Sequence, residues 1–285
     1  MRRLINVLVG LVALGIAGGV VVCAIPKFQQ AAARSQCQDN LKQLGLGLQN
    51  YYGTYDRFPS ATIPNENLPC CERLSYLVEL VPFLESFRLN LDKKKGWQDK
   101  ENLVPEAPNR DDNDRVIGPL TPPAGLRMFR CPTVDKDSPT YRANTTNYVG
   151  ISGVGPNAAE ASLGSLGVGF FGCERQIEVE DIKDGSANTL AMMETNWKNG
   201  PWTAGGFSTV RSLNFEDAPY VGAGRAFGSG HRRGEHWWSP TTSVVFTQAV
   251  FADGSVRALS AEISPEVLEA LATIAGAEET PPPAD

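Results

Sequence analysis

The chain begins with an apolar run from Leu4 to Ile25 that contains no charged residue. About 22 residues in a helix span about 30 Å, which is the thickness of the hydrocarbon core of a bilayer. Arg2 and Arg3 precede the run, and no acidic residue does. The positive-inside rule therefore predicts a single-pass anchor in the inner (cytoplasmic) membrane. Its N-terminus is inside, and the bulk of the chain is periplasmic or otherwise extracytoplasmic.

Two other interpretations of this run are weaker. A cleaved signal peptide has a shorter apolar core followed by a small-residue cleavage site. Ala31-Ala32-Ala33 has the right composition but lies well beyond the run. A lipoprotein would use Cys23, but Val22 stands where a small residue is needed. We therefore expect an anchor over residues 1–26 and an extracytoplasmic domain over residues 27–275.

Apolar residues at steps of three and four continue after the run and predict a helix that ends before Phe58-Pro59. They are Cys37, Leu41, Leu44, Leu48, Tyr51 or Tyr52, and Tyr55. Polar residues occupy the opposite face. Gly45 and Gly47 each weaken a helix by about 1 kcal/mol relative to alanine. Such small residues allow another element to approach closely, so we expect this face to be part of the core.

Shorter elements follow. Ser75–Leu89 has a helical pattern that Pro82 kinks or splits. Residues 90–127 are polar and are expected to form a loop. Ser264-Pro265-Glu266 has the residues of a helix start, and residues 276–285 are rich in proline and predict a disordered tail. Short strands are expected at 147–152, 168–171, 188–194, 243–251 and 256–259, the last two joined by an Asp-Gly turn.

Composition agrees with an exported, loop-rich domain of mixed structure. The net charge is −6 and no basic patch occurs, so nucleic-acid binding has no support. The chain contains 28 glycines and 20 prolines, which are high numbers for a helical bundle. Roughly 230 residues beyond the anchor are enough for one sizeable core.

The cysteines favour disulfides over a zinc site. Five of the six lie outside the apolar run, where disulfides persist: Cys37, Cys70, Cys71, Cys131 and Cys173. No Cys-x-x-Cys or His-x-x-x-His spacing occurs. An odd number leaves at least one thiol without a partner in the same chain, and buried free cysteine is the alternative.

No motif predicts an enzyme, a cofactor or a metal. Gly-x-Ser-x-Gly and phosphate-binding loops are missing. His231 and His236 are five residues apart in a loop, and structural roles suit them better than metal binding. Carboxylate pairs for glycoside hydrolysis depend on spatial spacing, and nothing in the sequence marks one out. Trp202, Trp237 and Trp238 could form a ligand-contact surface, although half-buried packing is the simpler interpretation.

Motifs spread over nearly the whole chain resemble those of the bacterial prepilin-like proteins grouped as domain of unknown function 1559. That family carries a C-terminal signature of His, nine residues and Asp-Gly. The matching stretches are Pro26–Ala33, Gln36–Leu46, Asn50-Tyr51, Arg57-Phe58-Pro59, Ser75–Leu84, Gly96–Asp99, Phe129–Pro132, Thr146–Gly150, Ile182–Leu190 with Glu194, and Phe251–Arg257.

The resemblance implies an α+β, type IV pilin-like fold, in which a long N-terminal helix packs on an antiparallel sheet with long loops. It also suggests a Cys37–Cys131 disulfide that ties the helix to the domain. Asp253-Gly254 supplies the positive φ that a tight turn requires, so turn chemistry suits Asp253 better than ligand binding. His231 fits the position of the signature histidine best.

The chain departs from the family pattern in two places. The Gly-Phe processing junction and the early membrane Glu of prepilins are missing, which weakens the expectation of processing and of filament assembly. In addition, 21 residues separate His231 from Asp253, so an insertion with His236, Trp237 and Trp238 lengthens this loop.

We therefore expect a non-enzymatic, membrane-anchored, pseudopilin-like envelope protein. Its partners would be the bilayer, through Leu4–Ile25, and pilin-like or other envelope proteins in a secretion or surface assembly. The alternatives are an anchored carbohydrate- or polymer-binding module that uses the loop tryptophans and, less favoured, a hydrolase.

Overall fold

The computed structural model describes residues 2–84, 91–103, 107–110, 116–121, 124–132, 144–222, 224–228, 231–233 and 244–276. Within these ranges, the side chains of residues 2–27, 107–110, 116–121, 124–126, 232–233 and 244 are not described. The predicted disordered tail therefore lies outside the described residues, apart from Gly276.

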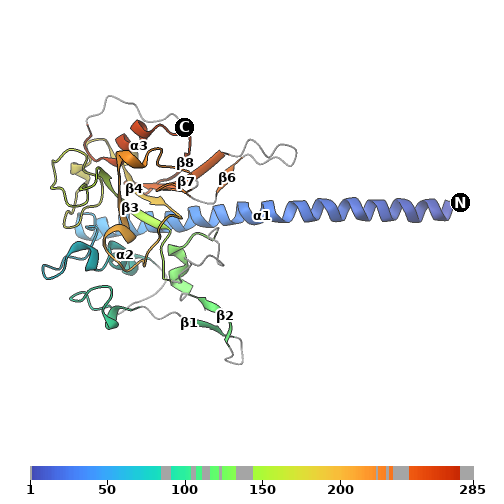
Figure 1. The fold of residues 1–285 in the computed structure, drawn as a ribbon, viewed down its shortest axis with the longest axis horizontal. Coiled ribbons are helices and arrows are strands. Elements are labelled where there is room, and N and C mark those ends of the chain that lie inside the picture. Colours follow the sequence, from blue (N-terminus) through green and yellow to red (C-terminus); the bar gives the residue numbers. More distant parts are fainter. Residues whose placement is uncertain are drawn as a thin grey trace.

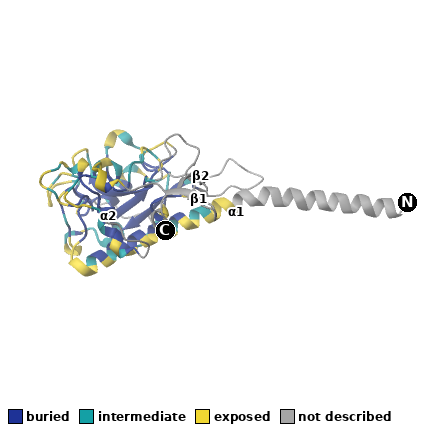
Figure 2. Ribbon diagram, turned by 90° about the horizontal axis from the view of Figure 1, so that it is seen from below, coloured by how far each residue is buried: buried dark blue, intermediate teal, exposed yellow. Residues whose placement is uncertain are grey.

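A single long helix, α1 (Arg2–Tyr55), enters the folded domain with its C-terminal part (Figure 1). Cys37, Leu41, Leu44 and Leu48 are at most 1% exposed and Tyr51 is 6% exposed, which confirms the predicted apolar face up to Tyr51. Tyr55, also predicted to lie on this face, is 50% exposed because the helix ends there. The helix ends as predicted before Phe58, and Asp56 leaves it in the left-handed region with φ 55°. Figure 2 shows the buried and exposed faces of this part of α1.

A membrane span is not identified among the described residues, since none of their helices combines the necessary length and apolar character. The side chains of the predicted span, Leu4–Ile25, lie outside the described ones.

The second predicted helix is split at Pro82, as the sequence predicted. It consists of α2 (Tyr76–Leu80) followed by the 3₁₀ turn η2 (Val81–Phe83), where the ring of Pro82 prevents continuation of the α-helix. Residues 85–89 lie outside the described residues. The other described 3₁₀ turns are η1 (Cys70–Glu72), η3 (Lys100–Asn102), η4 (Ala124–Phe129), η5 (Val179–Asp181), η6 (Ser186–Asn188), η7 (Gly206–Ser208) and η8 (Phe215–Asp217).

The central sheet is mixed, which corrects the expectation of an antiparallel one. In the described part of the chain its order is β5-β3-β4-β7, and β7 also pairs with β6 and β8. β3 and β5 run parallel, and the other pairs are antiparallel. The strands are β3 (Tyr148–Val154), β4 (Leu190–Glu194), β5 (Val210–Leu213), β6 (Arg232–Arg233), β7 (Val244–Phe251) and β8 (Val256–Ser260).

The parallel pair arises because the chain leaves β4, crosses to the far side of β3 and only then forms β5. The sequence pattern did not predict β5 or β6. Residues 168–171, predicted as a strand, form only an isolated bridge between Val168 and Gly153.

Helices cover both faces of this sheet. Val250 and Met192 point into the core that α1 completes, whereas Ala249 and Met193 belong to a second core. The second core is closed by α3 (Pro265–Ala272), whose N-cap Ser264 accepts a hydrogen bond from Val267 N, as its sequence predicted. Because both faces are covered, the β4 sequence Leu-Ala-Met-Met is buried throughout.

A separate hairpin corrects the prediction that residues 90–127 form a loop. β1 (Ala107–Arg110) pairs antiparallel with β2 (Val116–Thr121), and Figure 1 shows this hairpin to one side of α1. Proline within both strands, and glycine within β2, weakened the strand signal in the sequence.

Candidate functional site

The turn between β7 and β8 lies directly against α1. A Cβ atom at Gly45 would stand 2.9 Å from the carbonyl oxygen of Gly254. Four residues further along the helix, Gln49 donates a hydrogen bond to Ala252 O at 2.7 Å. Gly254 has φ +82°, as the Asp-Gly turn predicted. The small residues of α1 thus permit the expected close approach, and the approaching element is this hairpin.

Two disulfides join distant parts of the described chain. Cys37 of α1 is bonded to Cys131, with Cα atoms 5.2 Å apart, which confirms the pairing suggested by the family resemblance. Cys70 is bonded to Cys173, with Cα atoms 5.9 Å apart. Cys71 is a free, exposed thiol. The first bond attaches the core helix covalently to the domain behind it.

A buried polar cluster surrounds the Cys37–Cys131 bond. Glu194, at the end of β4, and His231, just before β6, bring a carboxylate and an imidazole to the two sulfur atoms. One ligand atom from each of the four side chains lies within 4.8 Å of the other three. His231 Nε2 is 3.5 Å from Cys131 Sγ and 3.2 Å from Glu194 Oε1. The four residues come from four separate segments of the chain.

The cluster is closed to solvent. Cys37 and Glu194 are 0% exposed, and Cys131 and His231 are 3% exposed. Neither carboxylate oxygen of Glu194 has a hydrogen-bond partner among the described residues. Burial, followed by the negative charge of Glu194, raises the pKa of Tyr148 well above its ordinary value. A substrate cannot reach this site without opening the core, so its chemistry is that of a buried ligand set.

Neither Glu194 nor a metal site was predicted from the sequence. His231 and His236 were the possible metal pair, and His236 lies outside the described residues. The available signal was an acidic residue directly after the apolar stretch Leu190–Met193, since a carboxylate is rarely fully buried unless it has a partner. Nothing in the linear spacing connects Glu194 with the cysteines.

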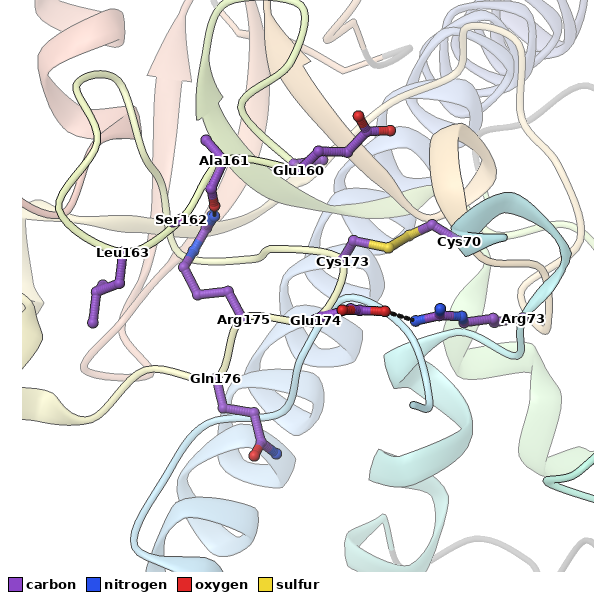
Figure 3. A pocket seen from close by; sticks show the side chains of 11 residues that line it. Cys70, Arg73, Glu160, Ala161, Ser162, Leu163, Cys173, Glu174, Arg175 and Gln176 are labelled. Atoms are coloured by element: carbon purple, nitrogen blue, oxygen red, sulfur yellow. Dashed lines mark hydrogen bonds and ion pairs between the residues drawn. A yellow bond between two sulfur atoms is a disulfide. The ribbon is translucent and has the colours of Figure 1, made fainter. Parts of the chain in front are cut away.

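A second feature is an open cavity of about 620 Å³ beside the Cys70–Cys173 bond (Figure 3). Arg73 and Glu174 form an ion pair of 2.8 Å at its edge. The cavity is lined by Cys70, Arg73, residues 159–163 and residues 173–176. The charges of Arg73 and Glu174 therefore offset each other.

Arg175 is the other cation of the cavity wall, and the protein itself engages it. Its guanidinium donates to Gly169 O at 3.1 Å and Phe171 O at 2.8 Å, and also to the carbonyls of Ala158 and Ala161. Burial lowers the pKa of Arg175 to about 10. These hydrogen bonds connect several loops, so the protein itself engages both cations of the cavity wall. Glu160 is the other acidic residue of the lining.

Of the other residues proposed for binding, Trp202 and Asp253 lie in the described part of the chain. Trp202 is 1% exposed and stacks on Phe129 with ring centroids 4.9 Å apart, so it is a core residue. Asp253 is exposed and caps its own turn by accepting a hydrogen bond from Ser255 N at 2.9 Å. Trp237 and Trp238 lie outside the described residues.

Comparison with known proteins places the chain in a family. Residues 27–266 match the family SBP_bac_10, described as "Protein of unknown function (DUF1559)", and the chain therefore belongs to it. No curated protein and no solved structure matches the chain.

Proposed function

We propose that this member of the DUF1559 family is a non-enzymatic, membrane-anchored, pseudopilin-like envelope protein that serves in a secretion or surface assembly. The observation that carries the proposal is the continuity of α1 from Arg2 to Tyr55. Among residues 28–55, whose side chains are described, the buried residues begin at Cys37. Figure 1 shows the rest of the helix extending away from the sheet. The same helix thus serves as the core of the domain and as its stalk.

The sequence and the covalent structure support an anchor in the membrane and an exported domain. The stalk carries the uncharged run Leu4–Ile25, preceded by Arg2 and Arg3. Two disulfides in the described domain favour a compartment in which disulfides persist.

An assembly role is supported by the outward face of α1. Phe28 is 75% exposed and Leu46 is 61% exposed. They are 18 residues apart, which is about five helical turns, so both point to the same side of the helix. A helix packed alongside α1, as in a pilin-like assembly, would cover both side chains.

The absence of enzymatic activity is supported by the burial of the cluster around Glu194 and His231. The carbohydrate-binding alternative gains no support from Trp202, because this ring is buried against Phe129.

Alkaline carbonate extraction of cell membranes tests the anchor. We expect the full-length chain to remain in the membrane pellet. The double variant Leu14→Arg/Ile16→Arg places two charges at the middle of the run, each unfavourable for insertion by about 3 kcal/mol, and should appear in the soluble fraction. Gly15→Ala leaves the run apolar and is the matched control. A wild-type chain found in the carbonate supernatant would contradict the proposal.

A further inference from the structure

The cluster around the Cys37–Cys131 bond has the donor atoms of a zinc site. Structural zinc is held by thiolate sulfur, imidazole nitrogen and carboxylate oxygen in a tetrahedral arrangement. Cys37, Cys131, His231 and Glu194 supply two sulfurs, one nitrogen and one oxygen, all within 4.8 Å of one another. The cluster therefore offers a complete set of four ligands without help from solvent.

The geometry around His231 supports a common centre. With bonds of 2.0–2.3 Å to zinc, neighbouring ligand atoms of a tetrahedral site lie about 3.3–3.8 Å apart. Nε2 of His231 is 3.5 Å from Cys131 Sγ and 3.2 Å from Glu194 Oε1. A single ring nitrogen thus faces both neighbours at nearly the separation that a shared ion requires.

The burial of Glu194 is a second indication. Its carboxylate is 0% exposed, and neither oxygen accepts a hydrogen bond within the described part of the chain, although His231 Nε2 faces Oε1 at 3.2 Å. The imidazole offsets the carboxylate charge only when it is protonated. A buried carboxylate is costly unless it is paired, hydrogen-bonded or bound to a metal. A divalent cation between Glu194, His231 and the two sulfurs would compensate this charge.

We propose that Cys37, Cys131, Glu194 and His231 bind Zn²⁺ in the dithiol form of the protein, and that the Cys37–Cys131 disulfide is the oxidised, metal-free form of the same site. The two forms exclude each other, because sulfurs bonded to each other cannot both act as thiolate ligands. Both forms connect α1 to the rest of the domain. The dithiol form does so through the metal, and the oxidised form does so through the disulfide.

The chemistry balances without an external reductant. Cysteines are synthesised as thiols, and binding of Zn²⁺ to the two thiols releases two protons. Oxidation then requires a disulfide-carrying thiol oxidant. The two thiolates give up two electrons and form the Cys37–Cys131 bond, the oxidant takes up these electrons with two protons to become a dithiol, and Zn²⁺ leaves. The proposal is independent of membrane anchoring.

The first test uses the wild-type full-length chain in detergent, kept fully reduced or fully oxidised, with Zn²⁺ and Co²⁺ as probes. We expect one tightly bound Zn²⁺ per reduced chain, measured by competition with a chromophoric chelator. Co²⁺ should give thiolate charge-transfer bands and the visible spectrum of a tetrahedral site. The oxidised chain should bind neither ion at this site. A reduced chain without the tetrahedral Co²⁺ spectrum, or equal binding by both forms, would overturn the proposal.

Matched cysteine variants separate this site from adventitious binding by other thiols. Cys37→Ser and Cys173→Ser each break one disulfide, but only Cys37 belongs to the cluster. The former should lose the tetrahedral site and the latter should keep it. Glu194→Gln keeps the side-chain size and removes the charge, and should weaken Zn²⁺ binding by about tenfold or more. Equal Zn²⁺ affinity in folded Cys37→Ser, Glu194→Gln and wild-type chains would refute the assignment.

Discussion

The contact between α1 and the β7–β8 turn can be tested by adding one methyl group at Gly45. In Gly45→Ala, the new Cβ would lie 2.9 Å from Gly254 O and 3.2 Å from Val250 Cγ1. The turn cannot easily retreat, because Ala252 O accepts from Gln49 and Asp253 N donates to Ser186 O. Overpacking of this kind costs about 1–3 kcal/mol, whereas alanine gains about 1 kcal/mol in helix propensity. We therefore expect Gly45→Ala to lower the free energy of unfolding by about 0–2 kcal/mol.

Gly53→Ala is the matched control on the same helix, since a Cβ there meets nothing within 4 Å. It should stabilise the protein by up to about 1 kcal/mol. Because both variants gain helix propensity, most of this gain cancels when their free energies of unfolding are compared. The remaining difference is the packing cost at Gly45, about 1–3 kcal/mol. Gly47→Ala should fall between them, because its new Cβ would meet only the flexible end of Leu84.

The assay is equilibrium urea unfolding of the full-length chain in detergent, followed by the fluorescence of buried tryptophans such as Trp202. The comparison is valid when the variants share one m-value. If Gly45→Ala proved as stable as Gly53→Ala, the close approach of the hairpin to α1 would be refuted.

Two further predictions concern buried charges. Burial raises the pKa of Glu79 above its ordinary value, against the opposing effects of Lys93 and of the hydrogen bond from Tyr51. The folded state therefore binds the proton more tightly than the unfolded state, and the wild type should lose stability as pH rises from about 4.5 through the raised pKa. Relative to wild type, Glu79→Gln should gain stability across that window, as urea unfolding at a series of pH values would show, and a pH-independent difference would contradict this. In Arg175→Lys the charge is kept, but the lysine ammonium cannot donate to all the carbonyls that the guanidinium engages. This variant should lower the free energy of unfolding by at least about 2 kcal/mol. Thermal unfolding would measure this loss, and the exposed Arg57→Lys, as its control, should change stability by no more than about 0.5 kcal/mol.

Local patterns in the sequence were enough to predict the elements whose geometry is set by residues close together in the chain. The three- and four-residue spacing of Cys37, Leu41, Leu44 and Leu48 identified the buried face of α1, because helix geometry alone places these side chains together. The Asp-Gly pair identified the β7–β8 hairpin for the same local reason, since Gly254 needs a positive φ.

Features that depend on distant segments were not predictable in this way. The parallel pairing of β5 with β3 is decided by the path of the chain after β4, which periodicity does not encode. The cluster of Cys37, Cys131, Glu194 and His231 draws one residue from each of four segments, and only the assembled sheet and helix bring them together. The Cys37–Cys131 pairing was accessible only through the family resemblance, because five external cysteines permit many pairings.

The central proposal is that α1 anchors the chain in the membrane and holds the domain outside the cytoplasm. Its most direct test is labelling of the exposed free thiol of Cys71 with a membrane-impermeant maleimide. We expect intact spheroplasts that carry the full-length chain to be labelled, and the Cys71→Ser variant to lose that signal. Labelling of Cys71 only after the spheroplasts are lysed would place the domain inside the cell and contradict the account.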